Sequence, residues 1–303
     1  MNDKEIEKFF CNMVKNDTQV SAGIAAICTL LKFLKHDKSD TVQELVTKLK
    51  KAVDVMLKTD CPITAVVSGS ELFLRFITLA TLDYSTFADC KKIMLHRGEV
   101  FLNKLKEARG KIAKLASSFI VDGSTVLTHS KSRVVLETFK EAAKENKRFK
   151  VYVTMSTPDN SGEQMADDLK DLNIPCTVII DPAIGYIMEQ VDMVMVGAEG
   201  VVESGGVINK VGSYTMALCA RLMKKPFYVL TESFKFSRLY PLNQRDLPNE
   251  FKYKYSMLSK DLEKLHPLVD YTPPAYISLL FTDLGILTPS AVSDELIKLY
   301  LTL

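Results

Sequence analysis

Apolar residues in the first third of the chain recur with the spacing of amphipathic helices. In residues 3–15 they follow the i, i+3, i+4, i+7 pattern that gathers them on one helix face. The same pattern predicts further helices from residue 17 or 18 to 34, from 41 to 56, from 72 to 82, and from about 86 to 119. Thr41 with Glu44, and Ser68 with Glu71, have the spacing of capping boxes that open helices. We therefore expect an all-helical N-terminal domain over residues 1–120.

The pattern changes near Gly123, where short apolar runs begin to alternate with helical segments. Strands are expected at residues 124–128, 150–154, 176–180, 193–196 and 227–231, and helices near 134–139, 163–172, 183–190 and 213–223. Such alternation predicts βαβ units, and therefore an α/β domain over residues 121–303 whose mostly parallel sheet has helices on both faces. A strand over 271–281, a turn at 282–285 and a helix over 292–299 are expected to complete it.

Charge and cysteine usage limit the classes of function. The net charge is +2, and basic residues do not cluster with aromatic ones, so direct binding of nucleic acid is not expected. No apolar core follows the charged residues 2–5, and no apolar stretch is long enough for a membrane span, so neither a secretory signal nor a membrane is expected. Six cysteines and four histidines are scattered without a Cys-x-x-Cys pair. We therefore expect no metal site, no disulfide framework and a reducing cytosolic compartment.

One stretch combines the features of an anion-binding site. The apolar run at 193–196 leads into a glycine-rich segment, residues 197–212, which ends where the helix over 213–223 is expected to begin. Within the segment lie an acid, an amide and a cation, namely Glu199, Asn209 and Lys210. Free N–H groups at a helix N-terminus and the helix dipole both favour a bound anion. The alternative interpretation is a tight turn that serves only the fold.

The end of the first expected strand is the second candidate, because ligands of parallel sheets bind beyond the carboxyl ends of the strands. Its candidate residues are Thr128, His129, Ser130 and Arg133. The hydroxyl, imidazole and guanidinium groups could bind a phosphate by hydrogen bonds and charge. Alternatively, His129 is a structural histidine and Arg133 is simply exposed.

Two further candidates have simpler explanations beside them. Asp181 lies at a strand end and could act as an acid or base, although an Asp-Pro pair often only forms a turn. Ser68 and Arg75 could supply a phosphate contact from the helical domain, although Ser68 also suits a helix cap. No Gly-x-Gly-x-x-Gly, P-loop or Gly-x-Ser-x-Gly motif is found, so no cofactor is expected.

Residues 196–212, VGAEGVVESGGVINKVG, resemble the signature loop of one protein family. This family joins methylthioribose-1-phosphate isomerases, ribose-1,5-bisphosphate isomerases and the regulatory subunits of eukaryotic translation initiation factor 2B. The stretches 68–76 (SGSELFLRF), 232–242 (ESFKFSRLYPL), 125–130 and 269–300 are similar to the alpha-subunit branch of that family. The resemblance extends over essentially the whole chain, and it implies a helical N-terminal domain followed by a Rossmann-like domain.

The resemblance also implies a place in an assembly. A homodimer formed through the Rossmann-like domains would join the beta, gamma, delta and epsilon subunits into a decameric guanine nucleotide exchange factor. The subunit itself would not catalyse exchange. Together with the beta and delta subunits, it would sense the phosphorylated alpha subunit of initiation factor 2, whose binding inhibits exchange under stress. The helical domain would help to receive this phosphorylated partner.

Two residues depart from the pattern of the active isomerases in the family. Those enzymes have a cysteine after the Thr-His of the first strand end and an aspartate in the signature loop, where this chain has Ser130 and Glu199. A hydroxyl is far less acidic than a thiol, and glutamate moves the carboxylate by one methylene group. We therefore expect that isomerisation has been lost.

The phosphate-handling groups are preserved in kind at Asn209, Lys210, His129 and Arg133. This predicts a sugar-phosphate pocket that is retained as a regulatory site. Two alternatives remain: a working sugar-phosphate isomerase, and a stand-alone dimer that senses a metabolite.

Overall fold

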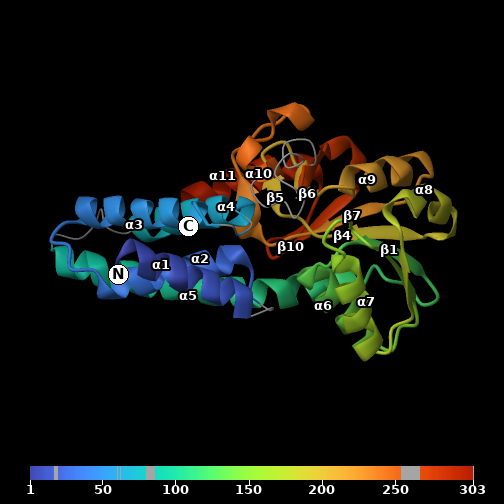
Figure 1. The fold of residues 1–303 in the computed structure, drawn as a ribbon, viewed down its shortest axis with the longest axis horizontal. Helices are drawn as coiled ribbons and strands as arrows, with labels where there is room; N and C mark the ends of the chain where they lie inside the picture. The colour runs from blue at the N-terminus through green and yellow to red at the C-terminus, as the bar shows by residue number, and fades with distance from the viewer. Residues whose placement is uncertain (17–19, 60, 62, 80–85, 254–266, 303) are drawn as a thin grey trace. The chain divides into compact units, whose positions relative to one another are not determined.

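The computed structural model describes residues 1–16, 20–59, 61, 63–79, 86–253 and 267–302 (Figure 1). The chain divides into two compact units. One consists of Met1–Glu107 with Ile297–Leu303, and the other of Ala108–Leu296. The division falls within the long helix α5 (Phe87–Ser117), rather than near residue 120 where the change of sequence pattern occurs.

The helical unit is built around α2 (Ala22–His36). This helix packs against α1 (Asp3–Asn16), α3 (Val42–Leu57) and α4 (Thr64–Thr78). Its side chains are buried on nearly every face, because the segment is apolar almost all round. Gly98 lets α5 approach α2 closely, since a Cβ atom at this position would lie 2.4 Å from the Leu31 side chain. The prediction of a helical N-terminal region is confirmed.

The helix starts confirm one capping prediction in part and correct the other. The Thr41 hydroxyl accepts a hydrogen bond from the Glu44 N–H at 3.2 Å, but the Glu44 carboxylate accepts from the N–H of Asp40 instead of that of Thr41. The predicted helix start at Ser68 is wrong, because α4 already begins at Thr64. Ser68 is buried within that helix and donates to the Thr64 carbonyl at 3.4 Å, so it caps no N-terminus.

Two other predicted helix ends lie outside the described residues, namely the start at residue 17 or 18 and the end at residue 82. Within the described residues, Ser21 caps α2. Its hydroxyl accepts from the Ile24 N–H at 3.3 Å, which satisfies one of the free donors of the first turn.

The α/β unit contains a seven-stranded sheet with the order β11-β10-β7-β4-β1-β2-β3 among the described residues. The strands are β1 (Thr125–His129), β2 (Lys150–Thr154), β3 (Cys176–Ile179), β4 (Met193–Val196), β7 (Phe227–Leu230), β10 (Leu279–Thr282) and β11 (Gly285–Leu287). All neighbours are parallel except β10 and β11. Numbered along the chain, the six parallel strands have the order 3-2-1-4-5-6 of the Rossmann fold. The predicted mostly parallel sheet is confirmed.

Helices cover both faces of this sheet. On one face, the end of α5, α6 (Arg133–Lys144) and α7 (Ser161–Asp171) form a core with alternate residues of β4, Met193 and Met195. The other pair, Val194 and Val196, is equally buried on the opposite face, where α9 (Ser213–Leu222) packs against β4 and β7. The strand is therefore buried on both faces, as its unbroken apolar run predicted. The helix predicted over 183–190 is divided into η2 (Asp181–Ala183), α8 (Ile184–Ile187) and η3 (Met188–Gln190).

A second sheet corrects two predictions. Part of the glycine-rich segment forms the antiparallel strands β5 (Gly200–Val202) and β6 (Val207–Lys210), which pair with β8 (Phe236–Ser237) and β9 (Val269–Thr272). The single strand predicted over 271–281 is two strands in different sheets, because Pro273 and Pro274 lack the N–H donors that a continuing strand needs. The predicted turn at 282–285 closes the β10–β11 hairpin, with β11 starting at Gly285. The remaining helices are α10 (Asn249–Tyr253) and α11 (Val292–Thr302).

Candidate functional site

The candidate site lies at the carboxyl ends of β1 and β4, where the strand order of the main sheet reverses. Connections leave these adjacent strands in opposite directions, which opens a crevice in folds of this class. His129 is the last residue of β1 and Ser130 follows it, and the segment from Gly197 to Glu199 follows β4. Lys210 reaches the same place from the end of β6 in the second sheet, since its ammonium contacts Ser130. The structure thus brings together the two separate sequence candidates.

Ser130 occupies an unusual backbone conformation. Its φ angle is +59°, in the left-handed region that non-glycine residues rarely adopt. Ser156, at the end of the neighbouring β2, has φ of +61°. Strained residues of this kind are found most often at binding and catalytic sites, where the surrounding structure holds them in place.

Lys210 is the centre of a small polar network. Its ammonium donates to the Asp159 carboxylate, to the Ser161 hydroxyl at 2.8 Å and to the Ser130 hydroxyl at 3.2 Å. The Ser161 hydroxyl donates to Asp159 at 3.0 Å, so at its 2.5 Å contact with Ser130 it acts as the acceptor. These three acceptors match the three N–H donors of a lysine ammonium. The network therefore joins β1, β6 and the start of α7.

His129 precedes Ser130 in the chain, and hydrogen bonds fix both of its ring nitrogens. Its Nε2 lies 2.9 Å from the Val211 carbonyl, which only accepts, so the ring proton resides on Nε2. Its Nδ1, 2.6 Å from the Thr154 hydroxyl, is then an acceptor. Burial lowers the pKa of His129 to about 4, against the opposing effect of the Asp181 carboxylate 4.0 Å away. The imidazole is neutral at pH 7, and both of its nitrogens are used by the protein.

The N-terminus of α9, where the sequence pattern placed the anion, is filled by the protein itself. The Asp270 carboxylate on β9 accepts from the N–H groups of Gly212 at 2.7 Å and Tyr214 at 3.0 Å. Burial raises the pKa of Asp270 to about 7, although these two hydrogen bonds act to lower it. Asp270 was not among the sequence candidates, because only the pairing of β6 with β9 brings it beside this helix.

The start of α6 offers donors at the same crevice. Its N-cap residue, Ser132, makes no side-chain capping bond, and the backbone of Gly197 lies against it. A Cβ atom on Gly197 would be 2.4 Å from the Ser132 hydroxyl oxygen. The first turn of α6 and its dipole therefore stand beside Ser130, in the position that favours an anion in folds of this class.

The other predicted residues of the α/β unit are Asn209, Thr128, Arg133 and Glu199. Asn209 donates to the Ser213 hydroxyl at 2.9 Å, so its amide holds the turn before α9. Thr128 is fully buried, and its hydroxyl has no hydrogen-bond partner in the described structure. Arg133 is the first residue of α6, and Glu199 is half-exposed after β4. Within the described residues, the Glu199 side chain makes no hydrogen bond or ion pair.

Asp181 braces the end of β2. Its carboxylate accepts from the N–H groups of Ser156 at 3.1 Å and Thr157 at 3.0 Å. Ser68 and Arg75 lie on α4 in the helical unit, and their suggested contact with a phosphate stays a prediction.

An ion cluster around the buried Glu232, which was not among the sequence candidates, contacts the backbone next to Glu199. The Lys235 ammonium lies 2.9 Å from the Glu232 carboxylate and donates to the Ala198 carbonyl at 2.8 Å. The Arg109 guanidinium lies 3.8 Å from the same carboxylate. Burial alone would raise the pKa of Glu232, but Lys235 and Arg109 outweigh it and hold that pKa below its ordinary value. The i, i+3 spacing of Glu232 and Lys235 was the only local signal of this cluster.

Three general features complete the picture. Within the described structure, no group of three or more His, Cys, Asp and Glu side chains is arranged to hold a metal ion. The six cysteines are free thiols. Among the helices that the structure describes, none has the length and apolar character needed to cross a membrane.

A family model described as the initiation factor 2 subunit family matches residues 15–289. The chain belongs to the initiation factor 2 subunit family. Within this family it is 47% identical to translation initiation factor eIF2B subunit alpha of Dictyostelium discoideum, over 96% of this chain and 95% of the relative. It is 40% identical to the corresponding subunit of Caenorhabditis elegans, over 99% of this chain and 100% of the relative. These two relatives confirm the resemblance to the alpha-subunit branch.

The chain is also similar to proteins named as enzymes. A ribose 1,5-bisphosphate isomerase of Archaeoglobus fulgidus is 28% identical over 86% of this chain and 82% of its own length. Among solved structures, an eIF-2B from Pyrococcus horikoshii OT3 matches with a TM-score of 0.73 and 26% identity, covering 94% of this chain and 98% of the other. A tetrameric eIF2B beta–delta complex from C. thermophilum matches with a TM-score of 0.80 over 99% of this chain and 96% of the other, and its 19% identity supports the fold alone.

Proposed function

We propose that this chain is the non-catalytic regulatory alpha subunit of the eIF2B guanine nucleotide exchange factor. The observation that carries the proposal is its similarity, from end to end, to two eIF2B alpha subunits. In this role it forms a homodimer through the α/β unit and joins the beta, gamma, delta and epsilon subunits into a cytosolic decamer. It helps to sense the phosphorylated alpha subunit of initiation factor 2, and this binding inhibits exchange under stress.

The chemistry of the crevice supports binding without catalysis. Ser130 presents a hydroxyl whose proton points to Ser161, and the neighbouring His129 has no free nitrogen with which to accept it. Nucleophilic or proton-transfer chemistry at a serine needs an adjacent base, and a hydroxyl is intrinsically much less acidic than a thiol. Lys210 and the start of α6 still suit a phosphate group. We therefore propose a degenerate isomerase site that retains the ability to bind sugar phosphates.

Affinity purification from cytosol tests the proposed assembly. We expect the tagged chain to recover the other four eIF2B subunits in constant proportion, because the alpha dimer joins two copies of each. The purified chain is expected to show no turnover of ribose-1,5-bisphosphate or methylthioribose-1-phosphate. Turnover that Glu199→Gln abolishes would instead support the working isomerase. A dimer that binds sugar phosphates but recovers no other subunit would support the stand-alone sensor.

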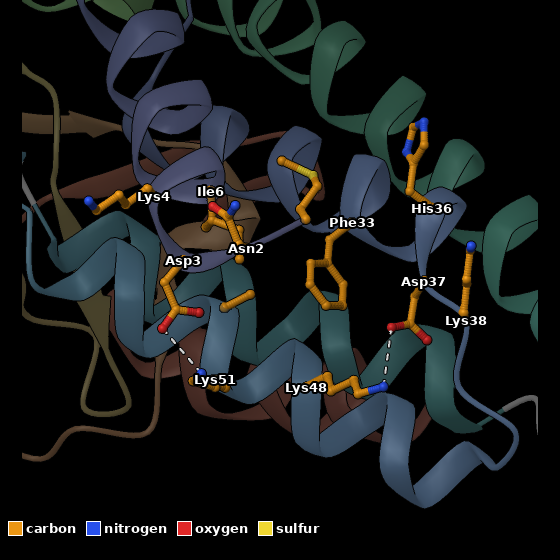
Figure 2. A pocket seen from close by; sticks show the side chains of 12 residues that line it. Asn2, Asp3, Lys4, Ile6, Phe33, His36, Asp37, Lys38, Lys48 and Lys51 are labelled. Atoms are coloured by element: carbon orange, nitrogen blue, oxygen red, sulfur yellow. Dashed lines mark ion pairs between the residues drawn. The ribbon is translucent and has the colours of Figure 1, made fainter.

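A basic hollow in the helical unit supports the proposed reception of a phosphorylated partner. It has a volume of about 850 Å³ and is formed by α1, the end of α2 and α3 (Figure 2). Its apolar side is made by Ile6, Phe33 and Ala52, and its basic lining by Lys4, His36, Lys38, Lys48 and Lys51. Both acids of the hollow are already paired, Asp3 with Lys51 at 3.1 Å and Asp37 with Lys48 at 3.8 Å (Figure 2). The hollow therefore has an excess of positive charge for a phosphate-bearing surface.

Lys4 and Lys38 are the most informative positions in the hollow. Both are exposed, and within the described residues neither makes an ion pair. The double variant Lys4→Glu with Lys38→Glu is expected to weaken binding of the phosphorylated alpha subunit of initiation factor 2 about tenfold at low salt, because both charges are reversed. Binding is measured by titration against the reconstituted decamer.

The matched control is Lys50→Glu with Lys58→Glu. These lysines are exposed on or next to α3 and do not line the hollow. The control should leave the affinity nearly unchanged, and the unphosphorylated partner should respond little to either variant. An equal loss in both double variants would show that net charge, and not the hollow, determines binding.

A further inference from the structure

The polar network in the crevice contains its own anion. We infer that Asp159 is a specificity-determining residue, whose carboxylate occupies the place on Lys210 that the phosphate of a ligand takes, so that binding requires its displacement. The inference rests on the proposed sugar-phosphate pocket and deepens it. It means that a phosphate has to compete with this carboxylate for Lys210.

The donors of Lys210 are already used in the described structure. Asp159, Ser161 and Ser130 accept its three hydrogen bonds, and Asp159 also neutralises its charge. An incoming phosphate therefore meets no available cation at Lys210 until one of these acceptors leaves. Among the three, Asp159 is the only one that carries a negative charge. It is accordingly the group that an anion repels and replaces.

The two oxygens of Asp159 have separate roles. Oδ1 accepts from the N–H of Ser161 at 3.1 Å and from its hydroxyl at 3.0 Å, which closes the turn at the start of α7. Oδ2 is the atom that faces Lys210. The carboxylate can therefore give up Lys210 while Oδ1 keeps the turn. Its side chain is 33% exposed and that of Lys210 is 26% exposed, so both are open to solvent and to a ligand.

Asparagine at this position separates the two roles. In Asp159→Asn, the amide oxygen can replace Oδ1 in the turn, whereas the NH₂ group in place of Oδ2 cannot accept from Lys210. The ammonium then lacks one acceptor and a compensating charge. We expect this variant to bind ribose 5-phosphate about tenfold more tightly than the wild type does, and also to bind inorganic phosphate more tightly. Unphosphorylated ribose should show no such gain.

Isothermal titration calorimetry with these three probes tests the inference. Lys210→Met in the Asp159→Asn background should remove the gain, because the phosphate then has no ammonium to bind. Asp167→Asn is the matched control, since it removes one charge from an exposed site on α7, the helix that follows Asp159. Asp159→Ser serves as the second variant if the asparagine variant does not fold.

The outcomes separate this inference from the proposed function. Equal or weaker phosphate binding by the Asp159 variants would overturn the inference, as would a gain that persists without Lys210 or that Asp167→Asn reproduces. If the wild type binds ribose 5-phosphate and the Asp159 variants bind it no better, the pocket stands and the role of Asp159 falls. Recovery of the other eIF2B subunits is measured independently, so a failure here leaves that test unaffected.

Discussion

Replacing Glu232 with glutamine is expected to lower the free energy of unfolding of the α/β unit by about 3–5 kcal/mol. Glu232 is almost completely buried, and its carboxylate faces both Lys235 and Arg109. Removing its charge takes the nearest carboxylate away from Lys235 and Arg109. Both cations are only partly exposed, so this costs more than the loss of an exposed ion pair. The Ala198 carbonyl would also lose a firmly positioned donor, so the backbone next to Glu199 should loosen.

Urea unfolding followed by circular dichroism measures this effect. Hydrogen exchange of β1, β4 and β7 would assign the transition to the α/β unit. Glu189→Gln is the control, because Glu189 is exposed and its variant should change stability by no more than about 0.5 kcal/mol. In Glu232→Gln with Lys235→Met, part of the stability should return, since the ammonium that lost its carboxylate is removed as well. Similar stabilities for Glu232→Gln and Glu189→Gln would contradict the role assigned to the cluster.

Between pH 7 and pH 4, the free energy of unfolding of the wild type should fall by about 3 kcal/mol more than that of His129→Gln. The pKa of His129 is lowered from 6.5 to about 4 by burial, so below pH 6.5 the unfolded chain binds a proton that the folded chain excludes. Stability therefore falls as the pH falls through this window, by about 1.4 kcal/mol for each unit of pKa difference. Glutamine does not titrate, so the variant lacks this loss.

The effect of His129 has to be measured as the difference in free energy of unfolding between the wild type and His129→Gln. The reason is that Asp270 changes this free energy with pH in the opposite direction. Its pKa is raised to about 7, so between pH 4 and pH 7 the folded chain retains a proton that the unfolded chain loses, and stability falls as the pH rises. This contribution is common to both proteins and cancels in the difference. Chemical denaturation at several pH values is the measurement. The control is Phe139→Leu, a core change without a titratable group, which should lower the free energy of unfolding equally at every pH. If the difference between the wild type and His129→Gln does not change with pH, the assignment of a buried neutral histidine is refuted.

The sequence predicted most helices and the parallel strands, because each depends on a local pattern. The unbroken apolar run of β4 and the helical period of α1 needed no knowledge of distant residues. The strand predictions were wrong where the pairing of segments far apart in the sequence determines the structure. Val207 and its neighbours form a strand because β5 and β9 lie on either side of them. The proline pair at 273–274 divides a run that is apolar on both sides.

The sequence singled out residues of the candidate site but did not give their arrangement in space. Ser130 and Lys210 were both singled out, and the fold brings them within hydrogen-bond distance although they are far apart in sequence. The sequence pattern assigned the anion to the start of α9. Asp270 already fills the start of α9, and the start of α6 is the one that stands at the reversal of strand order. Asp159 could not be found from a local pattern, because its partner Lys210 lies on another element. The only local signal of Glu232 was its spacing from Lys235, because Arg109 lies far away in the sequence.

The sequence by itself determined the alternation of helices and strands, the family, and which side chains stand at positions 130 and 199. These properties depend on residue type and local periodicity. Only the tertiary structure decided which groups are charged, paired or available. Burial makes His129 neutral, strand pairing aims Asp270 at α9, and the meeting of β1, β6 and α7 gives Lys210 its own carboxylate. Desolvation and charge compensation depend on what surrounds a group in space, and the order of residues along the chain does not contain that information.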